Sequence, residues 1–425
     1  MLCRGFVNAA GTVKTREDGL SELINTPYAR DIRARKVELP QMRILKKIAI
    51  ACLCLILILP QGAMGEAQEE IKLSADAAIL IEASTGRVIW EKNADERRYP
   101  ASMTKMMTGL LTLENLSDST EVLISANAAN TEDVPMGIQA GELLQAGELL
   151  NGLLMLSDNG AAVALAEQIG GSVSSFAEMM NAKAEKLGME NTHFVNPNGL
   201  TDSNHYSTAR DMAKLARHVM QDEKFREIVG QQKQLIRWSL PKDKMLMAEN
   251  TNELLGKYEG MTGIKTGWTQ AAGGCLAASA KRGGLELIVV VMHAETPKDR
   301  FKDAEKLLDY GFEHTRLVRG VNKDRFRGQA WVKNGREAQV GLDLAEDINY
   351  VLIDGEEKKN YKVAYESQPV LAAPVKKGQK VGAAKLLYKG EQVGEVDILA
   401  DKNVGAGSDW LSWLVGAFEP LFQRI

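Results

Sequence analysis

The chain has 425 residues, of which 45% are hydrophobic and 25% are charged, and its formal net charge at pH 7 is −4. This length exceeds one ordinary domain, and the composition is typical of a globular protein rather than of a disordered one. The acidic balance excludes the basic surface that nucleic-acid binding requires, so we expect no nucleic-acid partner.

The N-terminal region has the pattern of a targeting segment. A basic stretch at 42–47 precedes the apolar run 48–59 and the small residues 63–65. These three parts predict a secretory signal peptide over residues 42–65, because the apolar run is too short to span a membrane comfortably. The alternative is an uncleaved membrane anchor. A signal peptide begins near its own methionine, so we interpret residues 1–41 as a mis-called extension and Met42 as the true start.

Export would leave an acidic chain with little capacity for disulfides. The first 65 residues hold 10 Lys/Arg and 5 Asp/Glu, so the remainder carries a net charge of −9. Three of the four cysteines lie in the segment that would be removed, which leaves Cys275 alone. The histidines have no close ligand spacing, so we predict neither a metal site nor a cofactor. The expected location is the outer face of the cytoplasmic membrane, in the cell envelope.

Residues 70–316 combine strand and helix patterns. The first strands, 78–81 and 87–90, flank a turn and predict a hairpin. Helical patterns follow over 143–169, 173–187, 207–220 and 299–310, and the run 285–291 reads as a buried strand. This order predicts an α+β domain in which an antiparallel sheet is flanked by helices and carries an inserted helical lobe.

The pattern changes after residue 317. Short strand-like runs at 330–332, 350–353 and 396–399 are separated by glycine-containing turns, which predicts a small all-β domain over 317–405. The last segment, 406–425, predicts an amphipathic helix with a Trp- and Phe-rich face, kinked at Pro420. We expect this helix to associate with the membrane surface; the alternative is that it docks on the β domain.

The most informative stretch for function contains Ser102 and Lys105. A spacing of three places both side chains on one helix face, within contact distance. A serine hydroxyl is a poor nucleophile until a base removes its proton. A lysine can be that base once its pKa is lowered, for which burial beside another cation is the usual means. Ser-x-x-Lys alone, however, also occurs on solvated helices.

A second motif, Ser157-Asp158-Asn159, lies between two helical stretches, where a loop can present polar side chains to a cleft. We predict that Ser157 relays a proton to the leaving amine and that Asn159 binds a substrate amide. On its own, the same tripeptide is an ordinary turn or helix cap.

The third motif is Lys265-Thr266-Gly267, at the start of an expected strand. Lys265 would lower the pKa of Lys105 and attract a carboxylate, to which Thr266 would offer its hydroxyl. Gly267 would let a ligand approach the strand backbone closely. Alone, this tripeptide is typical of a hairpin end.

Together and in this order, the three motifs resemble the signature of the penicillin-recognising serine enzymes. The wider context resembles the low-molecular-mass penicillin-binding D-alanyl-D-alanine carboxypeptidases, from about residue 70 to the end of the chain. The stretches that carry this resemblance are 100–105, 196–200, 205–212, 263–267 and 373–378. The family has a β-lactamase-like peptidase fold, a C-terminal β domain and a terminal amphipathic anchor.

The resemblance implies roles for individual residues. Ser102 would form an acyl-enzyme with the penultimate D-alanine of a peptidoglycan stem peptide, and β-lactams would acylate the same hydroxyl. The backbone N–H groups of Ser102 and Trp268 would form the oxyanion hole. Arg300 would meet the terminal carboxylate of the substrate; its alternative role is an ion pair at a helix start. Many family members carry His where this chain has Trp268, which puts substrate fit and β-lactam sensitivity in question.

Three other functions remain open. A β-lactamase shares the motifs, but it needs a deacylating base, and no Glu-x-x-Leu-Asn stretch follows the second motif. A D,D-endopeptidase is a closer alternative. A catalytically silent envelope-binding module is disfavoured because every motif residue is intact. We predict that Cys275 is a small buried strand residue and that His205 is a structural hydrogen-bonding residue.

Overall fold

The computed structural model describes residues 71–407. The predicted extension and signal peptide lie outside this range, as does the predicted C-terminal helix from residue 408 onward. Within the described range, no helix is both long enough and apolar enough to cross a membrane.

A five-stranded antiparallel sheet forms the base of the first of the two regions, which precedes the all-β region, and its strand order is β2-β1-β9-β8-β7. Its strands are β1 (Ala77–Glu82), β2 (Val88–Lys92), β7 (Met261–Thr269), β8 (Gly273–Arg282) and β9 (Leu285–Ala294). The hairpin of β1 and β2 confirms the sequence prediction. Strand β7 lies at the edge of the sheet, with a neighbouring strand on one side only.

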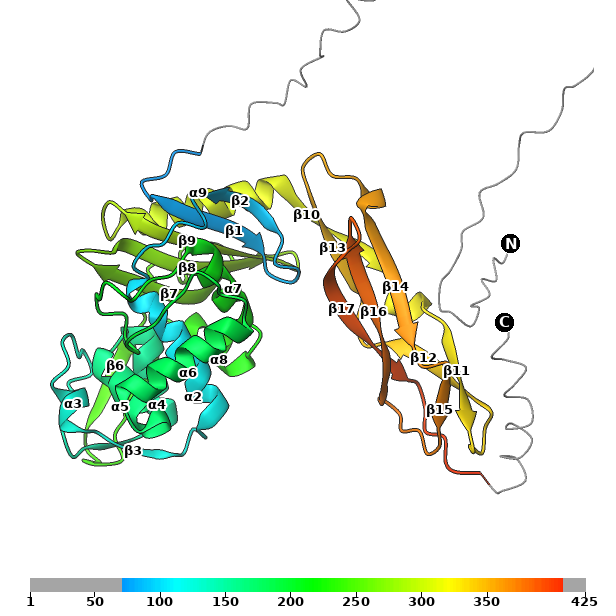
Figure 1. The fold of residues 1–425 in the computed structure, drawn as a ribbon, viewed down its shortest axis with the longest axis horizontal. Helices are drawn as coiled ribbons and strands as arrows, with labels where there is room; N and C mark the ends of the chain where they lie inside the picture. Colours follow the sequence, from blue (N-terminus) through cyan, green and yellow to red (C-terminus); the bar gives the residue numbers. More distant parts are fainter. Residues whose placement is uncertain (1–70, 408–425) are drawn as a thin grey trace, which may run out of the picture. The chain divides into compact units, whose positions relative to one another are not determined.

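Helices cover both faces of this sheet (Figure 1). Helix α9 (Asp299–His314) packs on one face, against β8 and β9, and α7 and α8 pack on the other. Burial from both sides explains why β9 is an almost unbroken apolar run rather than an alternating one. The predicted antiparallel sheet with flanking helices is therefore confirmed.

The helical lobe lies between β2 and β7 in the sequence. Its helices are η1 (Ala101–Thr104), α2 (Lys105–Asn115), α3 (Ala126–Ala129), α4 (Ala146–Asn151), η2 (Gly152–Leu156), α5 (Asn159–Gly170), α6 (Val173–Lys186), α7 (Ala209–Val219) and α8 (Glu223–Gly230). Two short ribbons accompany them, β3 (Glu121–Leu123) with β4 (Leu143–Gln145) and β5 (Lys233–Arg237) with β6 (Met245–Glu249).

The predicted helix over 143–169 does not begin at residue 143. The expectation that the second motif interrupts the helical segment is confirmed. Residues 143–145 form strand β4, because they pair with β3. The chain then runs through α4 and the π-helical turn η2 to Ser157, whose φ of 64° ends the helix. Asp158 caps α5 by accepting a hydrogen bond from the backbone N–H of Ala161. The second motif therefore sits at a helix break.

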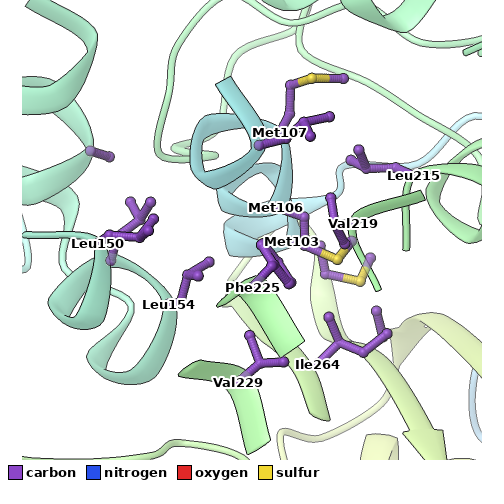
Figure 2. Close-up of a cluster of buried hydrophobic side chains, with 14 of the residues drawn as sticks. Met103, Met106, Met107, Leu150, Leu154, Leu215, Val219, Phe225, Val229 and Ile264 are labelled. Carbon is purple, nitrogen blue, oxygen red and sulfur yellow. The ribbon is translucent and has the colours of Figure 1, made fainter. Parts of the chain in front are cut away.

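A methionine-rich core fixes the helix that carries the first motif (Figure 2). Met103 and Met106 are fully buried and pack toward α7, α8 and β7. Gly109 brings α2 close to its neighbours, since a Cβ there would lie 3.2 Å from both Leu154 and Phe225. Because this core is close-packed on several sides, α2 has little freedom to move relative to β7.

The C-terminal region is all-β, as predicted. Its six-stranded sheet has the order β14-β16-β17-β12-β11-β15, and β10 pairs separately with β13. The elements are β10 (Thr315–Val321), η3 (Lys323–Arg325), β11 (Gly328–Lys333), β12 (Gln339–Leu344), β13 (Ile348–Ile353), η4 (Lys358–Asn360), β14 (Tyr361–Ser367), β15 (Val370–Ala372), β16 (Lys380–Tyr388) and β17 (Glu391–Ala400). The region has its own apolar core, which includes Val332, Val340 and Ile398.

Candidate active site

Ser102 and Lys105 lie side by side at the start of α2. Ser102 belongs to the turn η1, and Lys105 is the first residue of the α-helix. Lys105 Nζ lies 2.8 Å from Ser102 Oγ. The contact expected from their spacing is therefore present, although a 3₁₀ turn rather than an α-helix carries the serine.

Two further oxygens hold the Lys105 amine. Nζ donates to Asn159 Oδ1 at 2.7 Å and to the backbone carbonyl of Asn198 at 2.8 Å. The Asn159 amide nitrogen donates to the carbonyl of Glu132 at 2.7 Å, which fixes the orientation of the amide. Asn159 is itself positioned as the first residue of α5, directly after the capping Asp158. The first and second motifs thus meet at one amine.

Burial is the main reason why the Lys105 pKa is lowered, to about 7. The side chain is 0% exposed. The negative charges of Asp158 and Asp133 oppose this shift but do not cancel it. Burial was the expected means of lowering this pKa, and the additional contribution expected from Lys265 is not among the main causes of the shift. The pKa of Lys265 is lowered chiefly by burial of its side chain, and next by the positive charges of Lys105 and Arg300.

The third motif lies in the second half of β7 rather than at its start. Gly267 faces the beginning of the serine helix, since a Cβ there would lie 3.0 Å from the Ser102 nitrogen and 3.1 Å from that of Met103. Any side chain at this position would push the strand away from the nucleophile. Lys265 is 1% exposed and donates to the carbonyl of Thr266 at 3.1 Å.

Arg300 joins the third motif from the first turn of α9. Its Nη1 donates to the carbonyl of Gly267 at 2.7 Å. In the described part of the chain, no carboxylate forms an ion pair with this guanidinium, so the alternative of a helix-start ion pair is wrong. Arg300 is partly buried, and its Nε has no hydrogen-bond partner there. The site therefore holds a cation with unused donor capacity beside the edge strand.

Ser157 and Trp268 occupy less constrained positions. The left-handed backbone of Ser157 places this residue at the end of η2, two residues before Asn159. Its hydroxyl forms no hydrogen bond with any residue in 71–407. Trp268 follows the third motif on β7, and its side chain is 50% exposed. Thr266 exchanges a hydrogen bond of 2.6 Å with Thr251.

Sequence reasoning missed two participants. Asn198 contributes its backbone carbonyl oxygen, which every residue type has, so the side chain gives no signal for this role. Thr251 lies in a loop outside the three motifs. His205 and Cys275 are structural, as predicted. His205 Nδ1 accepts from the Val195 N–H, so Nε2 must donate to Thr104, and burial lowers the pKa of His205 to about 4. Burial raises the pKa of Cys275 to about 11.

Gly199 yields a prediction for the geometry of this site. It has φ of +87°, and a Cβ there would lie 1.9 Å from the carbonyl oxygen of Ala101. Gly199→Ala should therefore displace either the serine turn or the Asn198 carbonyl that holds Lys105. We expect acylation by a fluorescent penicillin to slow by about 100-fold, which matches the loss caused by small misplacements in active sites. Gly188→Ala, which also has a positive φ but open space around it, is the control. Equal rates for the two variants would contradict this prediction.

Comparison with known proteins shows which family this chain resembles. Residues 63–296 match the model of the D-alanyl-D-alanine carboxypeptidase family, and residues 317–406 match that of the penicillin-binding protein 5 C-terminal domain. The chain is 36% identical to the D-alanyl-D-alanine carboxypeptidase DacF of Bacillus subtilis (strain 168) over 345 residues, which cover 80% of this chain and 88% of that protein.

Two further comparisons extend over both regions. The chain is 32% identical over 378 residues to the D-alanyl-D-alanine carboxypeptidase DacC of Escherichia coli (strain K12), with 86% of this chain and 93% of that protein covered. The crystal structure of penicillin binding protein 5 from Haemophilus influenzae is 30% identical, superposes with a TM-score of 0.58, and covers 79% of this chain and 98% of its own. The chain therefore belongs to the D-alanyl-D-alanine carboxypeptidases of the low-molecular-mass penicillin-binding protein family.

Proposed function

We propose that this protein removes the terminal D-alanine from peptidoglycan stem peptides through an acyl-enzyme on Ser102, and that β-lactams acylate the same residue. The observation that carries this proposal is the set of hydrogen bonds made by the Lys105 amine. Asn159 Oδ1 and the Asn198 carbonyl can only accept hydrogen bonds. A neutral amine has two N–H groups and one lone pair. With both N–H groups used, the lone pair is left to accept the proton of Ser102.

In the acylation step, Ser102 Oγ attacks the carbonyl carbon of the penultimate D-alanine while its proton passes to Lys105. The negative oxygen of the tetrahedral intermediate would bind the backbone N–H groups of Ser102 and Trp268, which is the largest source of stabilisation in acyl transfer. As the C–N bond breaks, Ser157 would relay a proton to the departing D-alanine nitrogen: its hydroxyl gives up its proton and takes back the one that Lys105 had received from Ser102, which leaves both residues neutral. Water then hydrolyses the ester and regenerates Ser102.

The substrate carboxylate would be bound by Lys265, Thr266 and Arg300. None of the basic groups at the site forms an ion pair with a carboxylate in the described range, which favours an anionic ligand. An arriving carboxylate would stabilise the protonated form of Lys265, since opposite charges raise a lysine pKa. Protonated Lys265 would in turn keep Lys105 neutral. Gly267 would let the substrate backbone lie along the edge of β7.

Export and membrane association complete the proposal. The peptidoglycan substrate and the family support a place in the cell envelope. We further propose that residues 42–65 direct export and that residues 406–425 hold the enzyme at the outer face of the cytoplasmic membrane. The domain limits 70–316 and 317–405 also stay predictions.

The test of the proposed function uses the purified chain with a fluorescent penicillin and, separately, with diacetyl-Lys-D-Ala-D-Ala. We expect a stable fluorescent adduct and release of D-alanine. Rapid turnover of the penicillin would identify a β-lactamase instead. A third assay offers the chain cross-linked dimers of stem peptides. Cleavage of these dimers without release of terminal D-alanine would identify a D,D-endopeptidase. A folded chain that neither labels nor hydrolyses would be a silent binding module.

A further inference from the structure

The middle residue of the second motif, Asp158, is a buried acid without a counter-ion. Its side chain is 0% exposed, and no basic group in the described part of the chain forms an ion pair with it. Burial of a carboxylate is costly, and the proposed mechanism assigns this one no role. We propose that Asp158 is a positioning residue for the general base Lys105, an inference that rests on the proposed function. Its carboxylate fastens the loop 131–137 to the start of α5, and the loop in turn holds the Asn159 amide in place.

The two carboxylate oxygens of Asp158 bind two different segments of the chain. Oδ1 accepts a hydrogen bond from the Ala161 N–H at 2.7 Å, which caps α5. Oδ2 accepts one from the Met136 N–H at 2.8 Å, 22 residues earlier in the sequence. Burial raises the pKa of this carboxyl, and the two N–H donors act against that rise. An N-cap needs only one oxygen, so the second bond is a link between the loop and the helix.

Two glycines let the loop lie directly against this link. A Cβ at Gly152, in η2, would overlap with Met136 Sδ, so the methionine side chain occupies the space beside η2. A Cβ at Gly160, in α5, would lie 3.1 Å from Val134. Met136 is itself buried. Close packing on both sides of the carboxylate therefore leaves the loop little freedom as long as the link holds.

The loop returns two hydrogen bonds to Asn159. The Glu132 carbonyl accepts from the Asn159 amide nitrogen at 2.7 Å, and the Asp133 carbonyl accepts from the Asn159 backbone N–H at 3.3 Å. With its nitrogen held by Glu132, the amide presents Oδ1 to the Lys105 amine at 2.7 Å. A rotated amide would turn its N–H groups toward the amine and remove one of the two acceptors that direct the lone pair to Ser102.

The same carboxylate acts on the base through its charge. Asp158 and Asp133 are the acids that raise the pKa of Lys105 against the effect of burial. The charge of Lys105 also contributes to lowering the pKa of Lys265 on β7. Protonated Lys105 forms when Ser102 gives up its proton, and a nearby negative charge stabilises it. Removal of either acid's charge should therefore lower the pKa of Lys105 and move the rise in acylation rate to lower pH.

The test measures acylation by a fluorescent penicillin from pH 5 to 9, in stopped flow, for two substitutions of Asp158. Asp158→Asn offers only one acceptor oxygen to the two N–H groups. Asp158→Ser can still cap α5 but is too short to reach Met136 as well, and the retained cap favours a folded chain. We expect both variants to lower the limiting rate at high pH by about tenfold, because the base is misoriented. Both should also move the midpoint of the profile to lower pH.

Two further variants separate position from charge. The Asp133 side chain forms no hydrogen bond with any residue in 71–407, so Asp133→Asn removes a charge but keeps the link. This variant should move the midpoint to lower pH with little loss of limiting rate. Asp222→Asn alters the N-cap of α8, where Asp222 accepts from the Phe225 N–H at 2.8 Å, and is the matched control. It should change neither quantity. A purely structural role of Asp158 would lower the amount of active enzyme without moving the midpoint.

Hydrogen exchange followed by mass spectrometry tests the link without catalysis. The Met136 amide loses its acceptor, so residues 131–137 should exchange faster in both Asp158 variants than in the wild type or in Asp133→Asn. Wild-type exchange in both Asp158 variants would overturn the link. A shifted midpoint with an unchanged limiting rate in both would show that the carboxylate acts by charge alone, which would overturn the positioning role. A wild-type chain that does not label with penicillin, beside faster exchange in the Asp158 variants, would instead refute the proposed function and leave the link standing.

Discussion

Ser102→Ala is expected to abolish both stable labelling by a fluorescent penicillin and release of D-alanine from diacetyl-Lys-D-Ala-D-Ala. Without Oγ there is no atom to form the ester, so only the binding groups and the oxyanion site remain. Loss of a serine nucleophile in comparable hydrolases lowers the rate by a factor on the order of 10⁴ to 10⁶. Labelling in denaturing gels and D-alanine release measure the two losses directly.

The variant should remain folded, because Ser102 contributes a single side-chain hydrogen bond, to Lys105. A thermal melt close to that of the wild type checks this. Ser157→Ala is the matched control, since it removes a hydroxyl from the second motif but leaves the nucleophile. That control should label slowly rather than not at all. Covalent labelling of Ser102→Ala would show that another residue is the nucleophile.

Lys105→Met is expected to slow acylation by about 10³- to 10⁴-fold, near the upper range for removal of a general base. Methionine fills most of the buried volume but cannot accept the proton of Ser102. The wild-type acylation rate should rise with pH through about 7, because burial lowers the Lys105 pKa to about 7 and only the neutral amine acts as the base. Stopped-flow acylation measured from pH 5 to 9 tests both statements.

The rise in rate near pH 7 should disappear in Lys105→Met, whereas a structural role of Lys105 would lower the rate equally at every pH. Stability gives an independent check. The unfolded chain binds more protons than the folded one between the lowered pKa and the normal value of 10.5, so this residue makes wild-type stability rise with pH across that window. The variant should show a smaller rise in denaturant titrations. An unchanged rate profile in Lys105→Met would exclude Lys105 as the base.

Much of this enzyme could be predicted from local sequence. The spacing of Ser102 and Lys105, the β1–β2 hairpin and the short strands after residue 317 each depend on nearby residues and on periodicity. The three motifs also predicted the family, because their order along the chain is far more specific than any one of them. Strand β4 was missed, because a segment of only three residues shows no periodicity and becomes strand or helix according to the segment it pairs with.

The tertiary structure decided the chemistry of the site. Burial of Lys105, rather than the neighbouring Lys265, is the main reason for its lowered pKa, and burial results from the packing of the whole lobe. The Asn198 carbonyl and the contact of Arg300 with Gly267 are backbone interactions, which residue type does not encode. Sequence determined which groups were available, and long-range packing determined their distances, desolvation and hydrogen-bond partners.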